Sequence, residues 1–220
     1  MKRNLIEMSK KYETDKNPFG HNYVQFYSSI FDALQDEKLN LVEIGIGKKG
    51  GSAKLWDNFF VNSNIFILDY DPKIISRLSE VSKKVKPILV DQSKEDSLDG
   101  FATQYGPFDI IIDDGSHLFH HQKLSWERLW PHVKSNGWYI IEDVHFSYRD
   151  RYQHGSGQSI SDYFSTFIKE INWRGQTKFA NYRYYDNPKQ GKVLTPTFHQ
   201  KTIKSISFLP GIIALNKSEI

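Results

Sequence analysis

Short apolar runs alternate with segments of helical spacing through the middle of this chain. The runs predict five strands, at residues 41–46, 65–70, 87–90, 108–113 and 138–142. The segments between them predict helices at about 52–60, 73–82, 97–105 and 120–133. Runs such as FDIII and WYII are apolar throughout, as expected for strands covered on both faces. The alternation predicts a doubly wound, mostly parallel α/β sheet with right-handed crossovers.

The flanking segments predict additions to this core. Residues 5–11 and 23–34 predict an N-terminal helical cap, and residues 160–171 predict a further helix. Two apolar runs around Leu209-Pro210-Gly211 predict a C-terminal hairpin, which would complete a seven-stranded sheet with an antiparallel addition. Residues 143–157 are expected to form a mobile loop, and residues 172–200 an irregular lid or substrate wall.

We therefore expect one domain built from four consecutive parts. These are the helical cap at 1–38, the cofactor-binding core at 39–145, the lid and helix at 146–200, and the hairpin at 201–220.

Composition excludes several function classes. The chain of 220 residues is 39% hydrophobic and 25% charged, which is ordinary for a globular domain. A net charge of only +3, with scattered Lys and Arg, does not demand nucleic acid. The lack of cysteine excludes disulfides, thiolate catalysis and Cys–zinc sites. Without a long apolar run or a signal-peptide pattern, we expect a cytoplasmic protein with no membrane partner.

A glycine-rich turn follows the first predicted strand. Gly45, Gly47 and Gly50 have the G-x-G-x-x-G spacing, and a helix opens near Ser52. Glycines let the backbone approach a ligand closely, and the helix N-terminus favours negative charge. This turn predicts a nucleotide-like cofactor at the carboxyl edge of the sheet.

Polar residues at the next strand ends extend this cofactor hypothesis. Asp69 ends the second strand, where an acid about 20 residues beyond the glycines can bind a ribose diol. Asp91 and Gln92 follow the third strand and are candidates for the adenine amino group. These features suit NAD and S-adenosylmethionine equally. Glu43, inside the first apolar strand, favours the second, because a buried carboxylate needs donors that an amino-acid-bearing cofactor supplies.

Acidic residues and a histidine gather at two further strand ends. Asp114 and His117 follow the fourth strand, while Glu142, Asp143 and His145 lie at and after the fifth. These ends are neighbours in a doubly wound sheet, so we expect the acids to converge beside the cofactor. Clustered carboxylates repel one another unless a cation intervenes, and oxygen ligands favour Mg²⁺ or another hard divalent cation.

The order of the motifs identifies a family resemblance. The segments EIGIGKKGGS, ILDYDP, VDQS, FDIIIDDGSH and GWYIIEDVH, followed by a hairpin, resemble class I S-adenosylmethionine-dependent methyltransferases. More narrowly, they resemble the macrocin and mycinamicin sugar O-methyltransferases and the related cephalosporin-hydroxylase-like group. The segment KYETDK…HNY before the first strand is similar to a segment of that group. The resemblance spans about residues 11–217, and DDGSH and IEDVH are its most specific pieces.

The resemblance implies a magnesium-assisted methyl transfer to a sugar hydroxyl. His117 would be the general base, with Asp114 beside it, and Asp114, Glu142 and Asp143 would surround the metal. The residues implied at the cofactor are Glu43, Gly45, Gly47, Ser52, Asp69, Asp91, Gln92 and Asp113. The N-terminal segment would fold over the cofactor and acceptor. The residues implied at the acceptor are Tyr12, Thr14, Asp15, Lys16, Tyr23, His145 and Tyr184.

Alternatives remain open at this point. An NAD-dependent oxidoreductase explains the glycine turn and Asp69 but not the acids. A catechol-type O-methyltransferase and a non-catalytic binding protein on the same fold are further readings. Asp15 and Lys16 also fit a solvated ion pair in a turn, and the segment around Tyr184 also fits aromatic packing. The sequence leaves the identity of the acceptor and the oligomeric state, including a homo-oligomer, undetermined.

Overall fold

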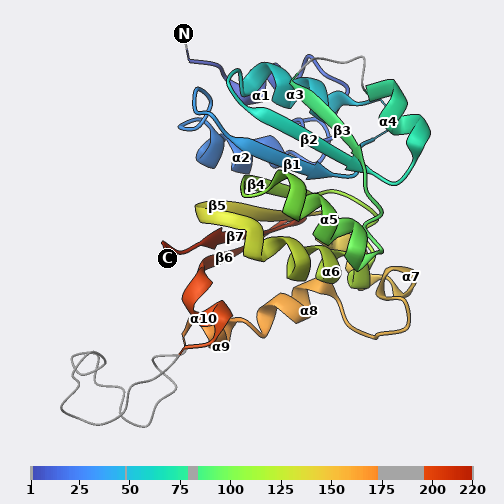
Figure 1. The fold of residues 1–220 in the computed structure, drawn as a ribbon, viewed down its shortest axis with the longest axis vertical. Helices are drawn as coiled ribbons and strands as arrows, with labels where there is room; N and C mark the ends of the chain where they lie inside the picture. The colour runs from blue at the N-terminus through green and yellow to red at the C-terminus, as the bar shows by residue number, and fades with distance from the viewer. Residues whose placement is uncertain (1, 48, 79–83, 173–195, 220) are drawn as a thin grey trace, which may run out of the picture.

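One seven-stranded sheet forms the centre of the molecule. The computed structural model describes residues 2–47, 49–78, 84–172 and 196–219. The strand order is β3-β2-β1-β4-β5-β7-β6, and Figure 1 shows the sheet between its helices. The strands are β1 (Asn40–Ile44), β2 (Asn64–Asp69), β3 (Val85–Leu89), β4 (Phe108–Asp113), β5 (Val133–Glu142), β6 (Ile203–Leu209) and β7 (Ile212–Lys217).

The sheet has the predicted mixed topology. Strands β1 to β5 pair in parallel, whereas β7 pairs antiparallel with both β5 and β6. The β6–β7 turn contains Gly211 at a φ of +78°, a conformation that glycine adopts without strain. An added Cβ at Gly211 would meet the Tyr23 ring, so the turn packs directly on α2. The predicted doubly wound sheet with a C-terminal hairpin is confirmed.

Strand alternation divides the core into two layers. Successive strand side chains point to opposite faces, so Leu41 packs in one cluster and Val42 in the other. One layer contains α1 (Leu5–Ser9), α2 (Tyr23–Phe31), α3 (Gly51–Phe59) and α4 (Pro72–Leu78). The other contains α5 (Glu95–Tyr105), α6 (Phe119–Leu129) and α8 (Ile160–Ser165). Fully buried Trp56 and Trp126 anchor the two layers, one in each.

Several predicted bounds differ from the structure after β4 and β5. The 3₁₀ turn η1 (Trp130–His132) follows α6, and β5 begins at Val133 instead of residue 138. The predicted loop at 143–157 contains two short helical turns, η2 (Val144–Tyr148) and α7 (Asp150–Gln153). Short elements of this kind give too few positions for a periodic signal.

The predicted helix at 160–171 is interrupted. It divides into α8 and α9 (Ile168–Ile171), because hydroxyls at the junction bond to backbone carbonyls three residues earlier: Ser165 to Asp162, and Thr166 to Tyr163. A helix not expected from the sequence, α10 (Phe198–Thr202), begins at a capping box on Thr197. The rest of the predicted lid, including Tyr184, lies outside the described residues.

No helix in the described ranges has the length and the apolar character needed to cross a bilayer.

Candidate active site

The acidic residues converge where β1, β4 and β5 end, and alternation decides which way each one points. Glu43 shares the face of Leu41, and Glu142 shares the face of Ile140, so both point into the layer that contains α2 and α3. Asp114 is one residue beyond the end of β4 and lies on this same side, where it meets Lys16. Three carboxylates from three neighbouring strand ends therefore meet under the N-terminal helices.

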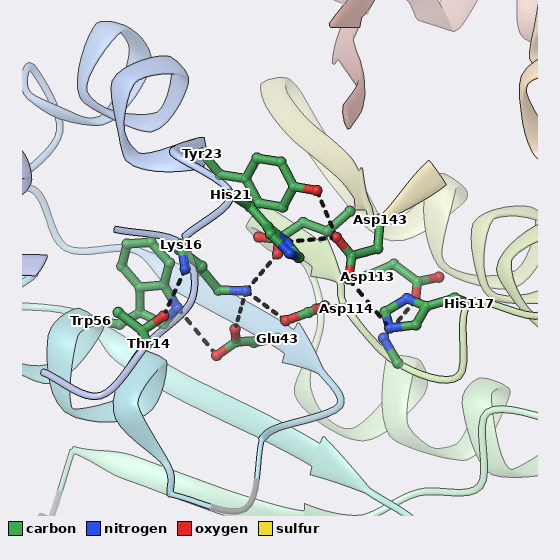
Figure 2. Close-up of polar contacts among 12 residues, drawn as sticks. Thr14, Lys16, His21, Tyr23, Glu43, Trp56, Asp113, Asp114, His117 and Asp143 are labelled. Atoms are coloured by element: carbon green, nitrogen blue, oxygen red, sulfur yellow. Dashed lines mark hydrogen bonds and ion pairs between the residues drawn. The ribbon is translucent and has the colours of Figure 1, made fainter. Parts of the chain in front are cut away.

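Lys16 lies at the centre of these carboxylates. Its Nζ is 2.6 Å from Asp114 Oδ2, 2.6 Å from Glu142 Oε2 and 3.3 Å from Glu43 Oε1. Figure 2 shows the lysine side chain entering from the N-terminal segment and pointing into the cluster. The residue is 1% exposed, so its cation is removed from solvent. Lys16 therefore makes its ion pairs in the interior instead of forming the solvated pair with Asp15.

Burial and charge act against each other in this cluster. Burial works to lower the pKa of Lys16, but the carboxylates of Asp114, Glu142 and Glu43 raise that pKa well above its ordinary value. Burial raises the pKa of Glu43 to about 7, although the Lys16 ammonium works to lower it. The lysine therefore remains charged. It supplies the counter-charge without which three closely spaced acids, two of them fully buried, would repel one another.

Glu142 is held by donors on both of its carboxylate oxygens. Its Oε2 accepts from Lys16 Nζ, and its Oε1 accepts a short hydrogen bond from the Tyr27 hydroxyl. Burial raises the pKa of Glu142 well above its ordinary value. The predicted role of Glu142 as a metal ligand remains a prediction. A carboxylate oxygen has a second lone pair, and so it can bind a cation while it accepts these bonds.

A second polar group surrounds Asp143. Its Oδ1 accepts from the Tyr23 hydroxyl at 2.6 Å and lies 2.9 Å from His21 Nδ1, and its Oδ2 lies 3.7 Å from His117 Nε2. Figure 2 shows His21, Tyr23 and His117 all turned toward this carboxylate. Asp114, His117 and Asp143 each offer one ligand atom, and these atoms lie within 4.8 Å of one another. The described residues therefore include a three-residue group with metal-binding geometry.

Two members of this group have strained backbones. His117 has a φ of +58° and Asp143 a φ of +55°, in the left-handed region that is costly for residues other than glycine. His and Asp are among the residues that tolerate it best. Strained conformations are retained when the surrounding structure demands them, and they concentrate at functional sites. The two strained residues are also neighbours, because His117 Nε2 lies 3.7 Å from Asp143 Oδ2.

A cavity of about 880 Å³ opens beside the acids, along the ends of β1, β2 and β3. Six of the predicted cofactor residues line it, namely Gly45, Gly47, Ser52, Asp69, Asp91 and Gln92. Asp114, His117 and Asp143 line the same cavity, so the candidate ligand group opens onto the predicted cofactor site.

The other two predicted cofactor residues lie beneath the cavity lining. Glu43 is fully buried between Lys16 and the Trp56 indole, which donates to it at 3.2 Å. Asp113 points to the opposite sheet face, because it is one residue before Asp114 on the strand. There it accepts from Gln92 Nε2 at 2.7 Å and from the Tyr139 hydroxyl at 3.3 Å. Burial raises the pKa of Asp113 to about 7. In this arrangement Asp113 supports Gln92 and does not reach the cavity.

The N-terminal segment forms one wall of the cavity. Thr14, Asp15 and Lys16 line it, and the Glu13 carbonyl packs on Gly51 so closely that an added Cβ would overlap it. Of the other predicted acceptor residues, Tyr23 reaches Asp143, whereas Tyr12 and His145 are not part of the lining. The His145 ring instead packs edge-on to His21, with centroids 5.8 Å apart.

His21 belongs to the polar N-terminal segment that was expected over the site, but neither its contact with Asp143 nor the interior position of Lys16 was predicted from the sequence. The apolar strand around Glu43 signals a buried acid and hence a buried partner. Spacing alone does not say which Lys or Arg supplies that partner, because the pairing spans segments far apart in the chain. His121 also lines the cavity, and its Nδ1 lies 2.7 Å from Ser116 Oγ.

The glycine turn supports a paired stability prediction. An alanine Cβ at Gly45 would overlap the Asp114 carbonyl, and the φ of +80° adds strain, whereas Gly47 has nothing within 4 Å of an added Cβ. We expect Gly45→Ala to lower the free energy of unfolding by roughly 2 kcal/mol or more, and Gly47→Ala by less than about 1 kcal/mol. Urea unfolding of both variants measures this. Equal losses would contradict the close contact between β1 and the Asp114 loop.

Comparisons with known proteins agree on one group. No family model matches the chain. Mycinamicin VI 2''-O-methyltransferase from Micromonospora griseorubida is 37% identical over 153 residues, which cover 67% of this chain and 37% of the relative. A tetracenomycin rhamnosyl 3'-O-methyltransferase from Streptomyces olivaceus is 33% identical over 150 residues, which cover 66% of this chain and 37% of the relative. The chain thus spans less than half the length of these two relatives.

A solved structure extends the similarity over the whole chain. The MycE methyltransferase of mycinamycin biosynthesis, in complex with Mg and SAH, superposes with a TM-score of 0.83 and 27% sequence identity. The match covers 100% of this chain and 55% of that one. By sequence and by fold, this chain therefore belongs to the class I S-adenosylmethionine-dependent methyltransferase family, and its sequence is similar to those of the mycinamicin and macrocin O-methyltransferases.

Proposed function

We propose that this chain catalyses S-adenosylmethionine-dependent methylation of a sugar hydroxyl, assisted by a divalent cation, with His117 as the general base. The observation that carries the proposal is the group formed by Asp114, His117 and Asp143 at the edge of the glycine-lined cavity. The relatives named above act on sugar-bearing natural products, and MycE was solved with Mg and SAH. Because this chain covers only part of the length of these relatives, its acceptor and its activity are proposals of their own.

The cavity has the features that S-adenosylmethionine requires. Gly45 and Gly47 bring the backbone to its floor, and Asp69, 8% exposed at the end of β2, is placed to accept hydrogen bonds from a ribose. Asp91 and Gln92 lie on the wall beyond it, where we place the adenine. When bound, S-adenosylmethionine supplies an activated methyl group on a sulfonium.

The donor set also suits a hard divalent cation. Asp114 and Asp143 provide carboxylate oxygens, which are the ligands that Mg²⁺ prefers, and Glu142 is adjacent through the shared Lys16 contact. A cation here would bind the acceptor oxygen and lower its pKa. The protein holds these carboxylates in place through Lys16, Tyr23 and Tyr27.

His117 is placed to take the acceptor proton. Its Nε2 faces Asp143, the ring stacks on Phe146 with centroids 5.4 Å apart, and the side chain is 18% exposed toward the cavity. As the new C–O bond forms and the sulfonium C–S bond breaks, the hydroxyl proton passes to Nε2, and S-adenosylhomocysteine leaves. The negative charge of Asp143 stabilises the imidazolium that results.

The first test is incubation with S-adenosylmethionine and a panel of nucleotide-sugars and deoxysugar glycosides, read by mass for a gain of one methyl. Binding of S-adenosylhomocysteine without any effect of NAD on thermal stability separates the proposal from an oxidoreductase. Methylation of catechol but of no saccharide would point to a phenol-specific enzyme instead. Binding of S-adenosylhomocysteine with no transfer to any acceptor would favour a non-catalytic protein.

Metal removal gives a second prediction. We expect EDTA to lower the transfer rate by about 10²-fold or more, because stabilisation of a developing alkoxide by a metal is worth several kcal/mol. Mg²⁺ or Mn²⁺ added in excess should restore the rate, whereas Ca²⁺, which is larger and less demanding in geometry, should restore less. A rate unchanged after exhaustive chelation would reject the metal-assisted mechanism and leave the cofactor assignment intact.

A further inference from the structure

Residues 13–23 lie between α1 and the first residue of α2, over the carboxyl ends of the central strands, and we name this segment the strap. Its residues Thr14, Asp15 and Lys16 line the cavity, and its His21 and Tyr23 reach Asp143. The strap thus contacts both the cavity and the candidate metal group. The contacts between the strap and the strand ends therefore determine whether the candidate active site is assembled before a ligand binds.

The contacts between the strap and the strand ends centre on one side chain. Lys16 Nζ contacts carboxylates that follow or lie on three different strands: Glu43 on β1, Asp114 after β4 and Glu142 on β5. Its backbone is fixed as well, because Lys16 N donates to Thr14 Oγ1 and Lys16 O accepts from Val24 N. Lys16 can make these three buried ion pairs only when the strap is docked onto the strand ends.

A second lysine bridges the same strap on the outside. Lys49 in the glycine turn pairs with Glu13 at 2.6 Å, but both side chains are about two-thirds exposed. Solvent screens an exposed pair, which contributes little to stability. Lys16 and Lys49 therefore make a matched comparison, because each forms an ion pair between the strap and the sheet region, one buried and one exposed to solvent.

We infer that Lys16 is a positioning residue that locks the strap onto the ends of β1, β4 and β5, and so assembles the cofactor wall and orients Asp114 before ligands bind. The inference rests on the proposed function for its ligands, but the docking itself is a property of the free protein. The alternative role for Lys16 is charge neutralisation alone. In that case the strap would stay docked without the lysine.

A double substitution separates positioning from neutralisation. Lys16→Met alone leaves the buried carboxylates of Glu43 and Glu142 without a cation and risks unfolding. At a pH well above 7, the value to which burial raises the pKa of Glu43, Lys16→Met combined with Glu43→Gln removes one positive and one negative charge, so the formal charge of the cluster is unchanged while the tether is lost. Lys49→Met is the control, because it removes the exposed ion pair with Glu13 of the strap.

The first readout needs no cofactor. In the double variant we expect amide hydrogen exchange in residues 13–21 to be at least about tenfold faster than in the wild type, with β1 and β4 unchanged, because the strap opens locally. Lys49→Met should exchange as the wild type does. A double variant that folds with a fully protected strap would overturn the inference and leave Lys16 as a counter-charge only.

The second readout is ligand binding. We expect S-adenosylhomocysteine to bind the double variant at least about tenfold more weakly, because part of the binding energy must then order the strap. Mn²⁺ affinity, measured by electron paramagnetic resonance, should also fall although the formal charge is matched. If the wild type itself fails to bind S-adenosylhomocysteine, the proposed function fails, but the exchange result still decides the role of Lys16.

A measurement on the unmodified protein decides the case if the variant does not fold. Under limiting acylating reagent at mild pH, with mass spectrometry by residue, Lys16 should react far more slowly than Lys49, because a buried, paired ammonium is neither accessible nor readily deprotonated. Comparable labelling of the two lysines would mean that the strap is open in solution, and the inference would be wrong.

Discussion

Replacing His117 by asparagine is expected to lower kcat for methyl transfer by about 10²–10⁴-fold, the usual contribution of a positioned general base. Asparagine is the informative choice, because His117 has a φ of +58° and asparagine tolerates the left-handed region better than alanine does. The substitution thus removes the imidazole without adding backbone strain. Single-turnover rates with a confirmed acceptor measure the effect.

His120→Asn serves as the control for this experiment. His120 is exposed in the first turn of α6, and it is not among the residues that line the cavity. It should keep the wild-type rate. The affinity of His117→Asn for S-adenosylhomocysteine should change little, since the base acts on the acceptor. An undiminished rate in His117→Asn would reject the base assignment while leaving the cofactor site untouched.

Asp143→Asn should abolish tight metal binding. We expect Mn²⁺ affinity to fall by at least about 10²-fold, because even the loss of an outer partner of a metal ligand costs 10–100-fold. The loss in transfer rate should exceed the loss in affinity, since the same carboxylate faces Tyr23, His21 and His117. Asparagine again suits the backbone, which has a φ of +55° at this position.

Asp91→Asn provides the matched comparison for Asp143. Asp91 lies on the far wall of the same cavity and outside the candidate ligand group. It should retain Mn²⁺ affinity and lose affinity for S-adenosylmethionine. Electron paramagnetic resonance and calorimetry together give both values. If the two variants bind Mn²⁺ equally well, the metal lies elsewhere, and the carboxylates serve only to hold the strap.

The parallel core could be predicted because its signals are local. A continuous apolar run such as FDIII predicts a buried strand without reference to the rest of the chain. The structure places β4 at Phe108–Asp113, as predicted. The strand ends then follow from topology, which brought Asp114 and Asp143 to a common cavity. The spacing of apolar residues did not predict η2, α7 or the break between α8 and α9, because these elements are short.

The side-chain partners within the site were not predictable in the same way. Asp113 and Asp114 are adjacent in a motif, yet they serve opposite faces of the sheet, and the difference of one residue decides which of them meets the cavity. Lys16 contacts acids that are distant in the chain, so no spacing rule identifies it. These pairings depend on tertiary docking of the strap.

The turn at Gly211 has a consequence for how the site forms during folding. This turn backs the Tyr23 ring, whose hydroxyl holds Asp143, and the Gly211 carbonyl accepts from Val144 N. Elements from the beginning, the middle and the end of the polypeptide therefore close on a single aspartate. Contacts so remote along the backbone form late and slowly, so catalytic competence should be among the last properties that a newly made molecule acquires.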